Sequence, residues 1–450
     1  MTMRFPRRTI LHWTLISTLG AAFSGAAGAE DLLQVYRLAE QKDPKFQGVQ
    51  STYRAILEHV PQARARLLYP NLSLSANTTE NWQDIQYNSG FSFLPGGNYS
   101  YNSRGYSLNL TQPVFHWDRY VQLKQAGSEV RQAQLEVDSA RQDLILRVAQ
   151  RYFDVLAAID NVDFSRAEKE ALARQLDQTQ QRFKVGLIAI TDVQEAKAGY
   201  DLSVADEIAA KKALDDAHEA LREIAGDLGK DLAQLGNTLP LIAPQPADAD
   251  KWTGTALKQN LKLASAEVSA EIANREIDVQ KAGHYPSVDI VGSHGSNITG
   301  GQFGHTDTDA SAIGVELNVP IYSGGLVVSR TREARFRHEA SLDQVEAQRR
   351  AATRQARDAY AGVISGISRV DALKQALKSN QTALEATEAG FAVGTRTAVD
   401  VVTQERELFG AKRNYARARY DYILDTLRLK QAAGTLSPAD LIEINKWLAH

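Results

Sequence analysis

Two long segments of the chain repeat small or apolar residues at alternating intervals of three and four positions. In the first segment these positions are Leu123, Ala126, Val130, Ala133, Val137, Ala140 and Leu144. In the second they are Leu408, Ala411, Tyr415, Ala418 and Tyr422, followed by Thr426, Leu429 and Ala433. This spacing is typical of coiled-coil seams, and alanine at alternate seam positions allows neighbouring helices to approach closely.

The prolines indicate how long these helices are. None occurs between Pro113 and Pro240, and none occurs between Pro320 and Pro438. Because proline is excluded from helix interiors, the two proline-free segments predict very long helices at matching places in two halves of the chain. One helix or a stacked pair over residues 117–186 would extend about 100 Å at about 1.5 Å per residue, which no compact globular domain requires.

Two short stretches near the middle of these helical segments have nearly the same sequence. They read RFKVGLIAITDV from Arg182 and GFAVGTRTAVDV from Gly390, at a constant offset of 208 residues. Gly186 and Gly394 are typical helix stop signals, and a T-x-x-Q capping box beginning at Thr191 predicts the start of the next helix. Each copy therefore predicts a tight turn between two antiparallel helices, at a distal tip of the molecule.

Ahead of each helical segment the residues alternate between apolar and polar. YPNLSLSA is matched by YPSVDIVGS, and YSLNLTQPVF is matched by IGVELNVPIY. Loops rich in Gly, Ser and Asn connect the paired strands, and they read QYNSGFSFLPGGNYSYNSR and NITGGQFGHTDTD. The pattern predicts two hairpins, at about residues 70–115 and 286–322, with strands of about ten residues and one apolar face, as in outer-membrane barrels.

Four strands cannot close a barrel, and an open strand edge cannot face lipid because its N–H and C=O groups would be unsatisfied. Cyclic symmetry closes the edges with further copies of the chain, and three copies would give twelve strands. The same symmetry arranges the helices as a hollow cylinder. The predicted fold class is therefore α+β, with a trimeric outer-membrane β-barrel continued by an α-helical coiled-coil barrel.

The beginning of the chain predicts a secretory signal peptide over residues 1–29. An arginine-containing start and an apolar run precede Ala-Gly-Ala at residues 27–29, so the mature chain would begin at Glu30. No later apolar run approaches the roughly 20 residues of a membrane-spanning helix. The chain contains no cysteine, which excludes disulfides, thiolate metal sites, a catalytic cysteine and a lipidated N-terminal cysteine.

Composition and motifs point away from catalysis and from nucleic acid. The formal net charge is −3 and the basic residues are spread along the chain, which argues against nucleic acid as a partner. The sequence has no H-E-x-x-H, no G-x-S-x-G and no phosphate-binding glycine loop, so we expect neither an enzyme nor a cofactor. His305 in GHTDTD could contribute to a weak metal site, but an ordinary solvated loop is the favoured interpretation.

These stretches resemble the TolC family of trimeric outer-membrane exit ducts. The resemblance covers almost the whole mature chain and is carried by AEDLLQVYRLA, RQLDQTQQRFKVGLIAITDVQEA and EAGFAVGTRTAVDV. It implies two repeats, over residues 30–240 and 241–450, and a small mixed equatorial domain from residues 228–250 and 435–450. It also implies an outer-membrane location extending into the periplasm, a periplasmic adaptor, and an inner-membrane transporter of the ABC or proton-driven type.

The resemblance further implies a network of polar contacts that holds the periplasmic entrance closed. On this chain the network falls on Gln175, Thr191, Asp192, Glu388 and Arg396. Phe391 stands where the best-known family pattern has a tyrosine, so one hydrogen bond of the gate would be missing. The alternative is that Thr191 and Asp192 only cap a helix, while Arg396 is solvated.

Two further groups of tip residues follow from the same resemblance. Asp400 would form a ring of three carboxylates in the lumen, and such a ring favours cations. Thr403 stands where relatives often have a second acid, so the ring would carry less charge. An aspartate in a first helical turn can instead serve only the helix dipole. The adaptor would bind the two tip motifs, which are Val185, Gly186, Leu187 and Val393, Gly394, Thr395.

Two other classes of protein remain open at this stage. A trimeric coiled-coil surface stalk or adhesin would share the heptads, but it would not require duplicated hairpins with polar faces. A barrel enzyme would need a serine and a histidine near one strand face, which we do not find.

The sequence of a duct does not indicate whether its substrate is a protein toxin or small drugs. Aromatic residues near the strand ends would form a membrane girdle or pack internally, and they are Tyr69, Tyr101, Tyr106, Phe115, Trp117, Tyr285 and Tyr322.

Overall fold

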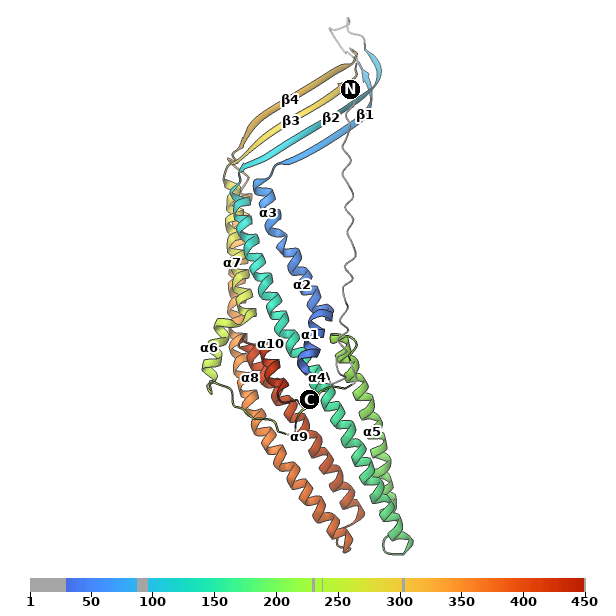
Figure 1. The fold of residues 1–450 in the computed structure, drawn as a ribbon. Helices are drawn as coiled ribbons and strands as arrows, with labels where there is room; N and C mark the ends of the chain where they lie inside the picture. Colours follow the sequence, from blue (N-terminus) through green and yellow to red (C-terminus); the bar gives the residue numbers. More distant parts are fainter. Residues whose placement is uncertain (1–29, 87–95, 229–230, 237, 302–303, 449–450) are drawn as a thin grey trace, which may run out of the picture.

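The structure is a computed structural model that describes residues 30–448, apart from 87–95, 229–230, 237 and 302–303 (Figure 1). The expected signal peptide and most of the loop between the first two strands lie outside the described residues. In chain order the elements are α1 (Leu32–Lys42), α2 (Pro44–Leu57), α3 (His59–Leu68), β1 (Asn71–Ile85), β2 (Gly97–Phe115), α4 (Trp117–Lys184), α5 (Ile190–Ala225), α6 (Ala249–Gln259), α7 (Leu261–Lys281), the 3-10 turn η1 (Ala282–His284), β3 (Ser287–Thr299), β4 (Thr306–Asn318), α8 (Leu326–Ala392), α9 (Ala398–Ala432) and α10 (Pro438–Asn445).

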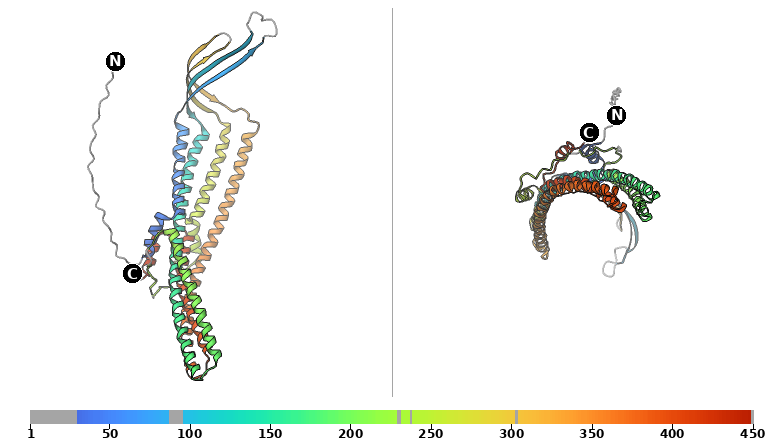
Figure 2. Two further views of the ribbon diagram at one scale, coloured as in Figure 1. Left: turned by 90° about the vertical axis from the view of Figure 1, so that its right-hand side faces the viewer. Right: turned by 90° about the horizontal axis from the view of Figure 1, so that it is seen from below.

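Long helices dominate the molecule, as the proline-free segments predict. α4 is one continuous helix of 68 residues, and α8 has 67. The structure confirms the tight turns between antiparallel helices, since α5 returns along α4 and α9 returns along α8 (Figure 1). Toward the sheet α4 packs against α3 and α7, whereas toward the tips it packs against α5 and α9. Seen from below, the helices form a curved layer with α9 on its concave side (Figure 2).

The four strands form one antiparallel sheet in the order β1-β2-β3-β4. The strands have 15, 19, 13 and 13 residues, so the expected length of about ten residues is too short. Residues 97–104, which read as a polar loop, belong to β2. They are held there by cross-strand hydrogen bonds, such as Asn102 Nδ2 to Glu80 Oε2 (3.2 Å) and Asn81 Nδ2 to Ser103 Oγ (2.9 Å).

Each face of the sheet has its own chemistry. Cross-strand partners share a face, and one face carries apolar residues, including Leu72, Leu74, Leu108, Leu110, Ile290, Ile313, Val315 and Leu317. The opposite face is polar, and over the described strand positions its only charged residues are the cross-strand partners Asp289 and Glu316. Over the half of the sheet nearer the helices, this alternation fits lipid on one side and water on the other. Toward the hairpin ends the first face carries charged residues, namely Glu80, Asp84, Arg104, Asp307 and Asp309. Among the described helices, none combines the length and the hydropathy needed to cross a bilayer.

The main core lies midway along the helices, where α1, α10 and residues 231–236 pack on α4 and α9. The buried ring of Phe153 stacks on that of Tyr420, with centroids 5.6 Å apart. The Tyr152 hydroxyl donates to the carbonyl of Ala233 (2.8 Å), which gives this buried backbone oxygen a hydrogen-bond partner. α1 buries the side chains at Leu32, Val35, Tyr36 and Ala39. At the start of α4, where the strands join the helices, Trp117 packs beside Tyr120 and Tyr285.

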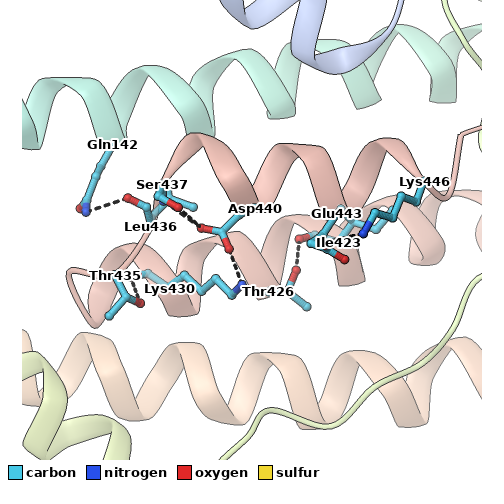
Figure 3. A network of polar contacts seen from close by, with 10 residues as sticks. All are labelled: Gln142, Ile423, Thr426, Lys430, Thr435, Leu436, Ser437, Asp440, Glu443 and Lys446. Atoms are coloured by element: carbon cyan, nitrogen blue, oxygen red, sulfur yellow. Dashed lines mark hydrogen bonds and ion pairs between the residues drawn. The ribbon is translucent and has the colours of Figure 1, made fainter.

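The segment after α9 is fixed by polar contacts (Figure 3). Gln142 on α4 donates to the carbonyl oxygens of Gly434 and Leu436, both at 3.1 Å. Asp440 in the first turn of α10 accepts a hydrogen bond from the Ser437 N–H (2.8 Å) and forms an ion pair with Lys430 of α9. These contacts hold α10 against α9 and α4 at the level of the core.

Candidate functional site at the helical tips

Both tips have the same backbone geometry. Gly186 and Gly394 adopt the left-handed conformation, with φ of 78° and 82°. The N–H of Gly186 bonds to the carbonyl of Phe183 (2.9 Å), and the N–H of Gly394 bonds to the carbonyl of Phe391 (3.2 Å). Glycine stops each helix here because a left-handed conformation costs other residues about 1–2 kcal/mol. The repeated sequence therefore encodes a repeated helical turn.

The two returning helices are capped differently. Thr397 is the N-cap of α9, and its hydroxyl accepts the N–H of Asp400 (3.3 Å). In the first copy the equivalent N-cap is Ala189, whose N–H donates to the Asp192 carboxylate (3.2 Å). The expected capping box at Thr191 is therefore wrong, because α5 already begins at Ile190 and Thr191 lies exposed in its first turn. The offset of the repeat, applied to Thr397, would have identified Ala189.

Asp400 is part of a complete capping box. Its carboxylate accepts hydrogen bonds from the N–H (2.9 Å) and the hydroxyl (3.0 Å) of Thr397. The backbone hydrogen bond from Thr397, then its hydroxyl, and the charge of Arg396 hold the pKa of Asp400 below its ordinary value. Asp400 is half-buried, whereas Thr403 one turn further along α9 is exposed. Capping and an anionic ring in the lumen are compatible, because both require the ionised carboxylate.

Over the described residues, no hydrogen bond or ion pair connects the residues of the expected gate to one another within one protomer. Over the part of the chain that the structure describes, no ion pair links Asp192 to Arg396. The aliphatic part of Arg396 instead lies over Gly390, where a Cβ would come within 2.8 Å of the Arg396 Cγ. Glu388 is exposed, whereas Gln175 is buried in α4. The described residues therefore show no direct Asp192–Arg396 latch within one protomer.

A contact that the sequence does not predict connects the two tips. The Arg182 guanidinium lies 4.3 Å from the centroid of the Phe391 ring, and its Nη1 donates to the Phe391 carbonyl (2.9 Å). Phe391 is buried beneath this arginine. Arg182 thus connects the end of α4 to the end of α8 by a cation–π contact and a hydrogen bond. In the repeat alignment Arg182 falls on Gly390. This difference between the two copies was the feature of the sequence that could have drawn attention to Arg182.

Polar residues also occupy the seam between α4 and α9 above the tips. The buried side chains of α4 in this region are Glu168, Leu172, Gln175 and Thr179. Glu405 of α9 is buried between Val401 and Leu408, at seam spacing of four and three. Glu168 pairs with Arg413 (2.8 Å). Glu405 is not among the site residues that the sequence predicts. Its spacing of four from Val401 and three from Leu408 places it in the apolar seam.

The remaining tip residues form an exposed apolar surface. The side chains of Val185, Leu187 and Val393 are 69 %, 72 % and 77 % exposed, and Gly186, Gly394 and Thr395 are exposed beside them. Within the described residues no cluster of His, Asp and Glu could hold a metal ion. The site therefore consists of two exposed apolar turns at the tips, with a helix seam that contains buried polar residues above them.

A two-faced four-stranded sheet standing on helical hairpins of this length defines an outer-membrane channel-tunnel. Residues 35–227 and 252–435 match the family model described as outer membrane efflux protein. The chain belongs to this family, and it is a channel protein of the outer membrane that extends into the periplasm. One of the two matched ranges lies in each half of the chain.

Relatives of known name agree with this assignment. The chain is 38 % identical to outer membrane protein TolC of Vibrio cholerae over 437 residues, covering 96 % of this chain and 97 % of that one. It is 30 % identical to alkaline protease secretion protein AprF of Pseudomonas aeruginosa over 420 residues, covering 92 % and 86 %. The CmeC outer membrane channel of Campylobacter jejuni shares the fold with a TM-score of 0.77 at 17 % identity, covering 92 % and 89 %.

Proposed function

We propose that three copies of this chain form the exit duct of a tripartite efflux or type I secretion system. The observation that carries the proposal is the similarity over nearly the full length both to a TolC and to a protease secretion protein. The duct offers substrates a water-filled path across the periplasm and the outer membrane. No comparison favours a surface stalk or adhesin.

The free edges of the protomer support threefold assembly. β1 and β4 are the edges of the sheet, and in a ring of three each β4 would pair with the β1 of the next copy. Beside the sheet, α8 exposes Phe336 and Leu342, and α3 at the opposite edge exposes Leu68. Covering these apolar side chains on a neighbouring copy provides a driving force for assembly. The apolar sheet face would then contact lipid.

The helical tips are the surfaces that we assign to partner proteins and to the gate. The exposed tip motifs around Gly186 and Gly394 would dock a periplasmic adaptor, which recruits an ABC or proton-driven transporter of the inner membrane. Residues 228–250 and 435–450, together with α1, would form the equatorial domain around the helical barrel. We place the gate at Gln175, Thr191, Asp192, Glu388, Phe391 and Arg396, and we add Arg182 to it.

Oligomeric state and conductance test this function. The purified protein in detergent should have the mass of a trimer by light scattering, and it should form ion-conducting channels in planar bilayers. A stable monomer with full β-structure, or a trimer without any conductance, would contradict the duct. The second result would favour the stalk.

The Asp400 ring predicts block by multivalent cations. Three ionised carboxylates repel one another in a narrow lumen, so a trivalent metal complex added from the periplasmic side should bind there. Thr403→Asp should strengthen the block by adding a second ring, and Asp400→Ala should weaken it. Salt should reduce the block, because exposed charges are screened over about 8–10 Å at physiological ionic strength. Bilayer titrations provide the measurement, and undiminished block in Asp400→Ala would place the constriction elsewhere.

A further inference from the structure

We infer that Glu405 is a proton-dependent gate residue, which keeps α4 and α9 packed while its carboxyl is neutral and loosens the seam when the carboxyl ionises. The inference rests on the proposed gating at the tips and extends it to a residue above them. It makes the closed state of the duct sensitive to periplasmic pH.

Glu405 occupies a position that an apolar residue would normally fill. It is 6 % exposed, and it lies one turn from Val401 and one turn from Leu408, both of which pack against α8 in the apolar cluster of the second tip. Its Oε2 has no hydrogen-bond partner among the described residues. A buried carboxylate without a partner is costly, whereas the neutral acid can remain buried and offers one donor and one acceptor.

Gln175 on the facing helix α4 also has a buried polar atom without a hydrogen-bond partner among the described residues. It is also 6 % exposed, and its Nε2 has no partner within the described part of the chain. α4 and α9 run antiparallel, and their contacts pair Glu168 with Arg413 and Asp160 with Tyr420. The same register places Gln175 at the level of Glu405. The seam therefore contains two unsatisfied polar groups at one level, and a small movement of either helix changes their surroundings.

Charged groups reach Glu405 from both neighbouring long helices. α4 contributes Glu168 and Arg174, and α8 contributes Glu388. Glu168 is itself neutralised by Arg413 of α9. α5 approaches α9 one turn below, where a Cβ on Gly199 would come within 2.9 Å of a methyl of Val402. The acid that α5 buries higher up, Glu207, is held by Lys169 and Lys211.

The balance of these effects favours the neutral acid. Burial is the largest cause, and with the negative charge of Glu388 it raises the pKa of Glu405 from 4.5 to about 7, while Arg174 opposes the rise and Glu168 adds to it. Because the pKa is raised in the packed state, the contribution of Glu405 to packing is fully present below about pH 4.5 and is lost as the pH rises through about 7. Opening admits water and relieves the carboxylate, so a rise in pH favours the open state.

Conductance as a function of pH tests the inference. Trimers carrying Asp400→Asn, which removes the neighbouring titratable ring, should be compared with and without Glu405→Gln between pH 5 and 8.5. With Glu405 present, the open-to-closed ratio should rise as the pH is raised from 5 to about 7 and level off above that. The rise is up to about tenfold per pH unit for each Glu405 carboxyl that ionises on opening. Glu405→Gln should remain closed across the range. Glu407→Gln, which changes an exposed acid on the same helix, should behave like its parent.

Two results separate this inference from the proposed gate. If Arg396→Ala opens the duct but Glu405→Gln keeps the full pH response, the gate stands and the role of Glu405 is wrong. If Arg396→Ala, Asp192→Ala and a change of pH all leave conductance unchanged, gating at the tips fails and the inference fails with it. Thermal unfolding provides an independent check, because the wild type should lose more stability from pH 5 to 8 than Glu405→Gln does.

Discussion

Gly434→Ala is expected to prevent assembly of the trimer. Gly434 follows α9 with φ of 77°, and a Cβ there would lie 2.1 Å from the carbonyl oxygen of Gln259 and 2.9 Å from the amide nitrogen of Asn260. Left-handed strain of about 1–2 kcal/mol adds to overpacking of about 1–3 kcal/mol. Because both contacts are to backbone at the junction of α6 and α7, no side chain can rotate away. The unfolding midpoint and the yield of trimer in detergent measure the loss.

Gly394→Ala is the matched control for this experiment. Gly394 has nearly the same φ, 82°, but a Cβ added there would meet no described atom within 4 Å, because it would point to the open side of the turn. Only the backbone strain of about 1–2 kcal/mol applies, so the trimer should still form. Equal destabilisation by the two variants would show that the close approach to Gln259 is unimportant.

Arg396→Ala and Asp192→Ala should each open the duct. If these groups join neighbouring copies, removing one of them costs the closed state about 1–3 kcal/mol, and each 1.4 kcal/mol changes the open-to-closed ratio about tenfold. Arg182→Ala should act in the same direction, because it removes the cation–π contact and the hydrogen bond to Phe391. Conductance in planar bilayers is the measurement.

Lys184→Ala provides the control for charge at the tip. Lys184 is exposed in the last turn of α4, next to the same turn, and its removal should leave conductance as in the wild type. Unchanged conductance in both Arg396→Ala and Asp192→Ala would leave these residues as caps and solvated charges. Opening in Arg182→Ala alone would assign the closed state to contacts within one protomer.

The long helices and the tip turns could be predicted because their signals are local and repeated. Proline is absent over each long segment, the seams have regular spacing, and a glycine stops each helix at the tip. The two amphipathic hairpins could also be predicted, because apolar and polar residues alternate along their strands. The resemblance to the family rested on the two tip motifs in their order, and the match of the family model to residues 35–227 and 252–435 shows the membership.

Other features depend on contacts between distant parts of the chain. β2 extends through an Asn- and Ser-rich stretch because its side chains bond across the ladder to Thr78, Glu80 and Asn81, which composition alone cannot reveal. The contact of Arg182 with Phe391 joins residues more than 200 positions apart. Ala189 breaks the capping pattern of its counterpart, and only the repeat offset identifies it as the N-cap.

α4 is continuous from the core to the first tip, so a rotation of the helix at the core would displace the tip. Phe153 is fixed between Tyr152 and Tyr420, and below it residues 154–184 continue without a break to the first tip. This stretch is about 46 Å long at about 1.5 Å per residue, so a tilt of about 5° at the core carries the tip about 4 Å sideways. If a partner docks at Leu187, as we propose, a small rotation of α4 near Phe153 would therefore produce a displacement of several ångströms at the tip.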